Sequence, residues 1–85
     1  MGLFKSSAEK ELDAMISRLD MNLSHAYKDN AQADLKSLDE RYDEMRRYGL
    51  LKNSAVIKYA DIIDSYTVKV KALEGSNRGM VGRWR

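Results

Sequence analysis

The sequence predicts one small all-α domain: an antiparallel three-helix bundle or a coiled-coil-like helical hairpin, followed by a flexible C-terminal tail. Three observations support this fold class. The chain has 85 residues, which is enough for one hydrophobic core and too few for two. Apolar residues recur at helical 3-4 spacing over three separate segments. The last eleven residues contain three glycines and show no such period.

The first helix is expected from Ser6 to about Lys28. Ser6 and Glu9 have the spacing of a capping box, in which each side chain accepts a hydrogen bond from a backbone N–H of the first turn. The apolar face that follows consists of Leu12, Ile16, Leu19 and Leu23.

The second helix is expected after a tight turn at residues 28–30. Beyond residue 28, the register of the first helix would bring mostly polar residues inward, and Asp29 with Gln32 offers a second capping pair. No glycine or proline marks this turn, so one long bent helix remains an alternative. The new apolar series consists of Leu35, Leu38, Tyr42 and Met45.

Gly49 is predicted to end the second helix, because glycine adopts the left-handed backbone conformation without steric cost, and Leu50 is then expected to cover Met45. Residues 66–71 of the third segment also alternate between apolar and polar side chains, as a strand would. A lone strand has no partner, however, so a helix is favoured. Gly75 is predicted to end this helix, which divides the chain into a helical domain at 1–74 and a basic tail at 75–85. The third series consists of Val56, Tyr59, Ile63, Tyr66, Val70 and Leu73.

These fourteen apolar residues are the predicted core and association stripe. Ile57 and Ile62 lie off the stripe of the third helix. Apolar surface is therefore expected to remain outside the core of one monomer, where self-association would bury it.

The composition argues against several kinds of chemistry. The chain has no cysteine and one histidine, which excludes a disulfide scaffold, a thiolate metal site and a cysteine nucleophile. His25 could be oriented by Asp29 four residues on, but one imidazole does not make a metal or catalytic site, so we interpret it as a surface residue. The acidic stretch at 39–44 is interpreted as an ion-paired helix face, because Arg46 and Arg47 follow at ion-pair spacing. No cofactor, metal or enzymatic activity is predicted.

The positive charge of the chain is concentrated at its ends. Residues 6–74 carry 13 acidic and 11 basic side chains, whereas residues 75–85 carry three arginines and no acid. A nucleic-acid-binding domain usually gathers its basic residues on the folded body. Binding of phosphates remains the alternative function, with a tryptophan stacking on a base. Its candidate residues are Arg46, Arg47, Arg78, Arg83, Trp84 and Arg85.

We therefore expect a non-enzymatic module that associates with itself or with another helical protein. No apolar run is long enough to span a bilayer and no secretory signal is visible, so the expected compartment is the cytoplasm. Residues 1–6 also fit the short pattern for N-myristoylation, which leaves membrane attachment at Gly2 as a third alternative.

Overall fold

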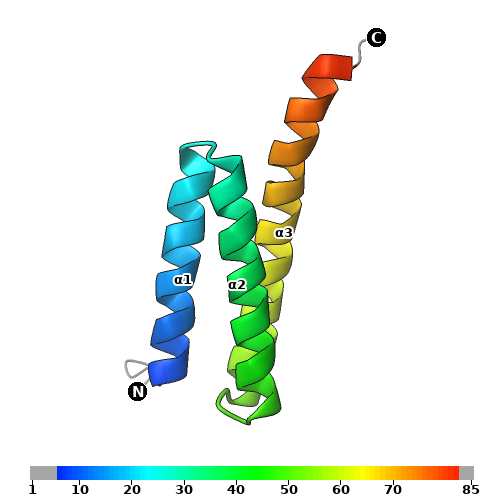
Figure 1. Ribbon diagram of the computed structural model, residues 1–85. Helices are drawn as coiled ribbons and strands as arrows, with labels where there is room; N and C mark the ends of the chain where they lie inside the picture. The colour runs from blue at the N-terminus through cyan, green and yellow to red at the C-terminus, as the bar shows by residue number, and fades with distance from the viewer. Residues whose placement is uncertain (1–5, 83–85) are drawn as a thin grey trace.

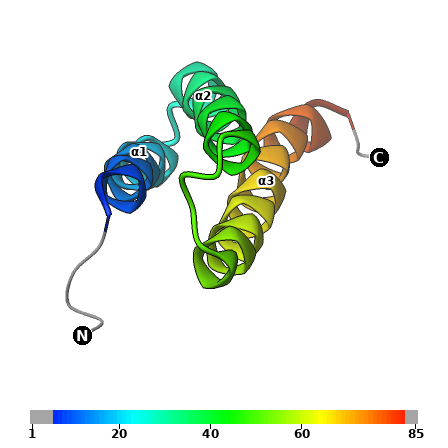
Figure 2. The ribbon, with the colours of Figure 1, turned by 90° about the horizontal axis from the view of Figure 1, so that it is seen from below.

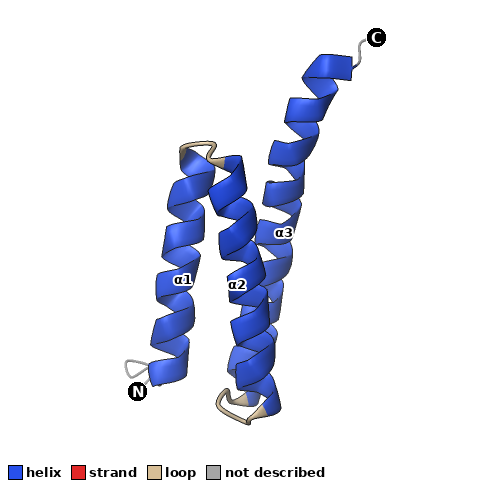
Figure 3. Cartoon of the chain, viewed as in Figure 1, coloured by secondary structure: helices blue, strands red, loops and turns tan. Residues whose placement is uncertain are grey.

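The computed structural model describes the backbone of residues 6–82 and the side chains of residues 6–74. It contains three helices, α1 (Ser7–Ser24), α2 (Lys28–Arg47) and α3 (Asn53–Gly82), and no strand within the described residues. The helices run up, down and up, so that α1 and α3 are parallel and α2 is antiparallel to both (Figure 1). Short loops join them (Figure 3). The predicted three-helix bundle is confirmed.

The start of α1 agrees with the predicted cap. The Ser6 hydroxyl oxygen accepts a hydrogen bond of 3.2 Å from the backbone N–H of Glu9. This bond satisfies one of the N–H groups that a helix leaves without a partner in its first turn.

The turn between α1 and α2 lies earlier than predicted. Helix α1 ends at Ser24, and Ala26 takes the left-handed conformation with φ of 57°. The N–H of Ala26 bonds to the carbonyl of Leu23 and that of Tyr27 to the carbonyl of Asn22, which is a Schellman motif. The prediction of a turn at 28–30 was wrong because this motif normally carries glycine. The predicted Asp29 cap is wrong as well, since α2 starts at Lys28 without a side-chain cap.

The turn between α2 and α3 has the same hydrogen bonds and lies where it was predicted. Gly49 has φ of 68°, and the N–H of Leu50 bonds to the carbonyl of Met45 at 2.9 Å. Leu50 itself is exposed, contrary to expectation, and the next residue, Leu51, packs into the core instead.

Helix α3 does not end at Gly75 as predicted. Its backbone is helical through Gly82, and residues 66–71 are helical too. An internal glycine costs a helix about 1 kcal/mol relative to alanine, which weakens it without stopping it. The predicted flexible tail is therefore corrected for residues 75–82, and residues 83–85 lie outside the described part.

Helix α3 is much longer than its neighbours. At 1.5 Å per residue, its 30 residues measure about 45 Å, against about 30 Å for the 20 residues of α2. The C-terminal part of α3 consequently extends past the turn that joins α1 to α2 (Figure 1).

The core lies between the three helices. Helix α2 packs against both neighbours more extensively than α1 and α3 pack against each other (Figure 2). Tyr42 joins α2 to α3 by donating its hydroxyl proton to the carbonyl of Val56 at 2.8 Å. The buried apolar residues are Leu12, Leu19, Ala31, Leu38, Tyr42, Met45, Leu51, Ala55, Tyr59, Ile63 and Val70.

Candidate association surface

Eight of the fourteen stripe residues are buried in the core of the monomer itself: Leu12, Leu19, Leu38, Tyr42, Met45, Tyr59, Ile63 and Val70. The other six are only partly buried: Ile16, Leu23, Leu35, Val56, Tyr66 and Leu73. The second group is more accessible to a second chain, and all of its members except Val56 line grooves between the helices.

Two tyrosines of α3 fix its position beside α1. The Tyr59 hydroxyl donates to an Asp13 carboxylate oxygen at 2.7 Å, and the Tyr66 hydroxyl donates to an Asp20 carboxylate oxygen at 3.0 Å. Both pairs are separated by 46 residues, so the two parallel helices keep one register over one heptad. Sequence analysis missed these pairs, although the two aspartates and the two tyrosines are each seven residues apart.

The tyrosine hydroxyls are held in their neutral form. Burial raises the pKa of Tyr59, and the hydrogen bond to Asp13 raises it further. Burial and the hydrogen bond to Asp20 raise the pKa of Tyr66 in the same way. These hydroxyls therefore act as donors between helices.

The register also shows where α1 stops supporting α3. The same offset of 46 residues places Ser24, the last residue of α1, level with Val70. Near the start of α2, the Gln32 side chain donates to the Glu74 carboxylate at 2.5 Å. The turns of α3 after Glu74 lie past both of these points.

A groove of about 440 Å³ separates α2 from α3 near this end of the bundle. Leu35, Ile63 and Val70 line its apolar part. Its charged lining residues are Lys36, Asp39, Asp64 and Glu74, so the lining carries a formal charge of −2. Among the described side chains, Asp39 and Asp64 form no ion pair. We call this surface the α2–α3 groove.

Two shallower grooves lie between α1 and α3, with volumes of about 440 and 410 Å³. The Lys69 ammonium lies 4.7 Å from the centroid of the Tyr66 ring and borders both grooves. The apolar lining residues are Ile16, Leu23, Ile62, Tyr66, Ala72 and Leu73.

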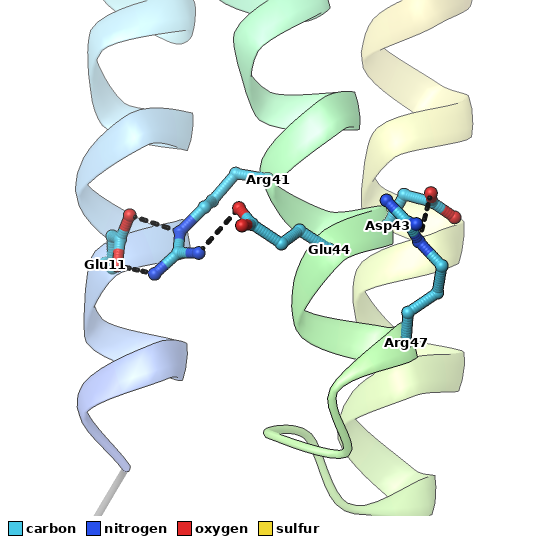
Figure 4. A network of polar contacts seen from close by, with 5 residues as sticks. All are labelled: Glu11, Arg41, Asp43, Glu44 and Arg47. Carbon is cyan, nitrogen blue, oxygen red and sulfur yellow. Dashed lines mark hydrogen bonds and ion pairs between the residues drawn. The ribbon is translucent and has the colours of Figure 1, made fainter.

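Arg41 connects α1 to α2 on the side of α2 opposite to Asp39 and the α2–α3 groove. Its guanidinium donates to both carboxylate oxygens of Glu11 at 2.7 and 3.0 Å and to Glu44 at 2.8 Å (Figure 4). The hydrogen bond from Arg41 lowers the pKa of Glu11. No role was predicted for Arg41, because the spacing of residues along one helix does not show which residues form ion pairs with another helix.

The arginines proposed for phosphate contact are already paired where the structure describes them. Arg46 and Arg47 both bond to Asp43, at 2.7 and 3.1 Å (Figure 4 shows the pair with Arg47). The hydrogen bond from Arg46 lowers the pKa of Asp43. The side chain of Arg78, together with Arg83, Trp84 and Arg85, lies outside the described residues, as does Gly2.

His25 belongs to a turn. Because α1 ends at Ser24, His25 and Asp29 do not share one helix face, and the expected pairing of the two is wrong. The His25 ring instead stacks on Tyr27 with 5.3 Å between ring centroids. Among the described residues, no cluster of histidine, aspartate or glutamate has the arrangement of a metal site.

Large apolar side chains are also exposed away from the grooves. Ile57 is 65% exposed, as its position off the stripe predicted, whereas Ile62 packs partly against the core. The other exposed residues of this kind are Met21, Tyr27, Tyr48, Leu50 and Val68.

Comparisons with protein-family models, curated proteins and solved structures found no significant match. Within the described residues, none of the helices has the length and apolar character needed to cross a membrane.

Proposed function

We propose that this protein is a non-enzymatic association module that binds a partner helix along the end of α3. The observation that carries this proposal is the continuation of helix α3 beyond the rest of the bundle. In the sequence, the alternating 3-4 steps that run from Val56 to Leu73 would next fall on Asn77, Met80 and Trp84, of which only Met80 and Trp84 are apolar. Helix α3 extends past the α1–α2 turn over part of this segment.

This spacing is typical of a helix that packs against another helix along one seam. In the first part of α3, the neighbours are α1 and α2, and the seam residues Tyr59, Ile63 and Val70 are buried. Past the α1–α2 turn, those neighbours have ended (Figure 1). A helix from another molecule would complete the seam, which supports association over a role for the bundle alone.

The charged residues favour association through this seam over nucleic-acid binding by the helical body. Asp43 offsets the charge of Arg46 and Arg47 locally, and paired cations at the end of a helix are explained by the helix dipole. The arginines at 78, 83 and 85 keep phosphate binding as the alternative. The expected compartment remains the cytoplasm.

Light scattering coupled to size exclusion tests the proposal, with runs at low salt and at about 0.5 M salt, where surface charges are strongly screened. We expect a mass above that of the monomer at low salt. A labelled single-stranded oligonucleotide provides the matched test of the alternative. A monomer at both salts that binds the oligonucleotide in a steeply salt-dependent way would contradict the proposal and support nucleic-acid binding.

A further inference from the structure

We infer that the partner helix comes from a second copy of this chain, which binds antiparallel so that residues 75–85 of each copy occupy the α2–α3 groove of the other. This inference rests on the proposed function, because it names the partner that the end of α3 takes.

The first argument concerns which groove the C-terminal end of α3 can reach. Helix α3 is continuous through Gly82 and points away from the body of its own bundle (Figure 1). Its C-terminal segment therefore cannot turn back into the groove that the same helix lines. The groove lies near the projecting end, however, since Val70 and Glu74 line it. A second copy related by a two-fold axis close to Leu73 would bring its own segment alongside the groove.

The second argument is charge, which selects the antiparallel arrangement. Residues 75–85 carry Arg78, Arg83 and Arg85 and no acid, whereas the groove lining carries a formal charge of −2. A parallel pair would place the arginines of the two copies side by side, where like charges repel. The antiparallel pair places them against the acids of the groove.

The register of this pair is consistent with the sequence. Around an axis near Leu73, Arg83 of one copy comes level with residue 63 of the other, next to Asp64 of the groove lining. Arg85 comes level with Asp61, which lines the neighbouring groove between α1 and α3. Both aspartates are exposed. The same alignment brings the apolar residues Met80 and Val81 along the part of the groove lined by Ile63 and Val70.

The geometry is isologous, so each dimer contains the contact twice. Antiparallel docking would cover apolar lining on both copies and pair two sets of arginines with two sets of acids. Association of this kind is predicted to weaken as salt rises, because the rim contacts are exposed charges.

The test uses two full-length charge-reversal variants. One carries R78E, R83E and R85E in the terminal segment, and the other carries D39K and D64K in the groove. Alone, each variant sets like charges against each other in both contacts of its homodimer, and we expect its dissociation constant to rise by about tenfold or more. Mixed in equal amounts, the two variants regain opposite charges in both contacts, so we expect a heterodimer with nearly the native affinity.

A matched control carries K10E, R18E and K52E, which change the net charge as much as the terminal variant does, at exposed positions outside the groove. We expect the control to keep the native mass in light scattering. Circular dichroism of every variant reports whether the helices remain formed. Restored association on mixing would exclude a simple folding defect, because neither variant can repair the fold of the other.

The remaining outcomes separate the two proposals. If the unaltered chain forms a dimer that both variants retain, or if the mixture stays monomeric, the antiparallel groove contact is wrong while association itself stands. If the unaltered chain is monomeric at every concentration, self-association is wrong and this inference fails with it.

Discussion

The two parts of α3 belong to one continuous helix and have different surroundings. Between Val56 and Val70, α1 and α2 cover the seam, and Tyr59, Ile63 and Val70 are almost completely buried. After Glu74, the helix continues past the α1–α2 turn, and the next positions of the 3-4 series within it are Asn77 and Met80. The difference teaches that spacing identifies which residues need a partner. The lengths of the neighbouring helices decide whether the same chain supplies it.

The largest effect is expected at the buried seam. Ile63→Asp places a carboxylate at a position that is 6% exposed, and we expect it to cost about 3–5 kcal/mol, enough to unfold so small a domain. Val68→Asp, on the same helix at 67% exposure, should change the free energy of unfolding by about 0.5 kcal/mol or less. Urea denaturation followed by circular dichroism measures both. Equal losses in the two variants would show that the seam is not where we place it.

The next effect concerns the two tyrosines that hold α3 against α1. Tyr59→Phe removes a buried hydroxyl that bonds to a carboxylate, and we expect a loss of about 1–2 kcal/mol. Tyr66→Phe lies at a partly exposed site closer to the C-terminal end of α3, and it should lower the free energy of unfolding by less than about 1 kcal/mol. Denaturation midpoints of the two variants give the comparison, and the reverse order would place the tighter contact near the end of α1.

The tyrosines also predict a dependence on alkaline pH. Burial and the carboxylate hydrogen bonds raise the pKa of Tyr59 and Tyr66 above the ordinary value of 10.0. Their contribution is therefore fully present below pH 10 and is lost as pH rises through the raised pKa values. Above pH 10, the native chain should lose stability more steeply than Tyr59→Phe does. Parallel curves would mean that the Tyr59 hydroxyl is not protected in the folded state.

A smaller effect is expected at the turn that ends α1 and so sets where α3 loses its neighbour. Ala26 holds a left-handed backbone that is costly for any residue with a Cβ, and Ala26→Gly should stabilise the fold by about 0.5–1 kcal/mol. Gly49→Ala, in the matching turn, should destabilise it by about 1 kcal/mol. An added Cβ at Gly49 meets no atom within 4 Å, so the cost is that of the backbone alone. Thermal denaturation shows both signs, and a loss of stability in Ala26→Gly would contradict the left-handed assignment.

The smallest effect on the stability of the fold is expected for the exposed ion pairs of α1 and α2, on the side that α3 does not cover. Arg41→Ala removes the exposed ion pairs to Glu11 and Glu44 and should lower the denaturation midpoint slightly. The pKa of Glu11 is lowered, so its contribution is present above the ordinary value of 4.5 and is lost as pH falls through the lowered pKa. Arg46→Ala breaks an ion pair within α2 and should have less effect still. If the effect of Arg41→Ala is the same at neutral and acid pH, the Glu11 pair contributes nothing to folding.

Much of the fold followed from local patterns. The Ser6 cap, the three helices and the glycine turn at Gly49 each express a preference of a few neighbouring residues, and the structure confirms them. The errors occurred where a local preference was weak. Ala26 occupies a glycine position, and Gly75 sits inside a helix, so residue identity predicted the wrong boundary at both places.

The candidate surface was less predictable. Sequence analysis could place Leu35 and Ile63 on apolar faces, but it could not show that they line one groove with Asp39 and Asp64 beside them. It also missed the Tyr59–Asp13 and Arg41–Glu11 contacts, which join different helices. Such pairings depend on the register between helices, and register is a property of the assembled bundle.

The sequence by itself determined the helical class, the apolar faces and the excess of positive charge at the C-terminal end, because spacing and charge are properties of the chain alone. The tertiary structure decided where α1 and α3 end, which stripe residues the monomer buries, and that α3 extends beyond its neighbours. The physical reason is that these features depend on which helices lie side by side and over what length, and packing between distant segments settles both.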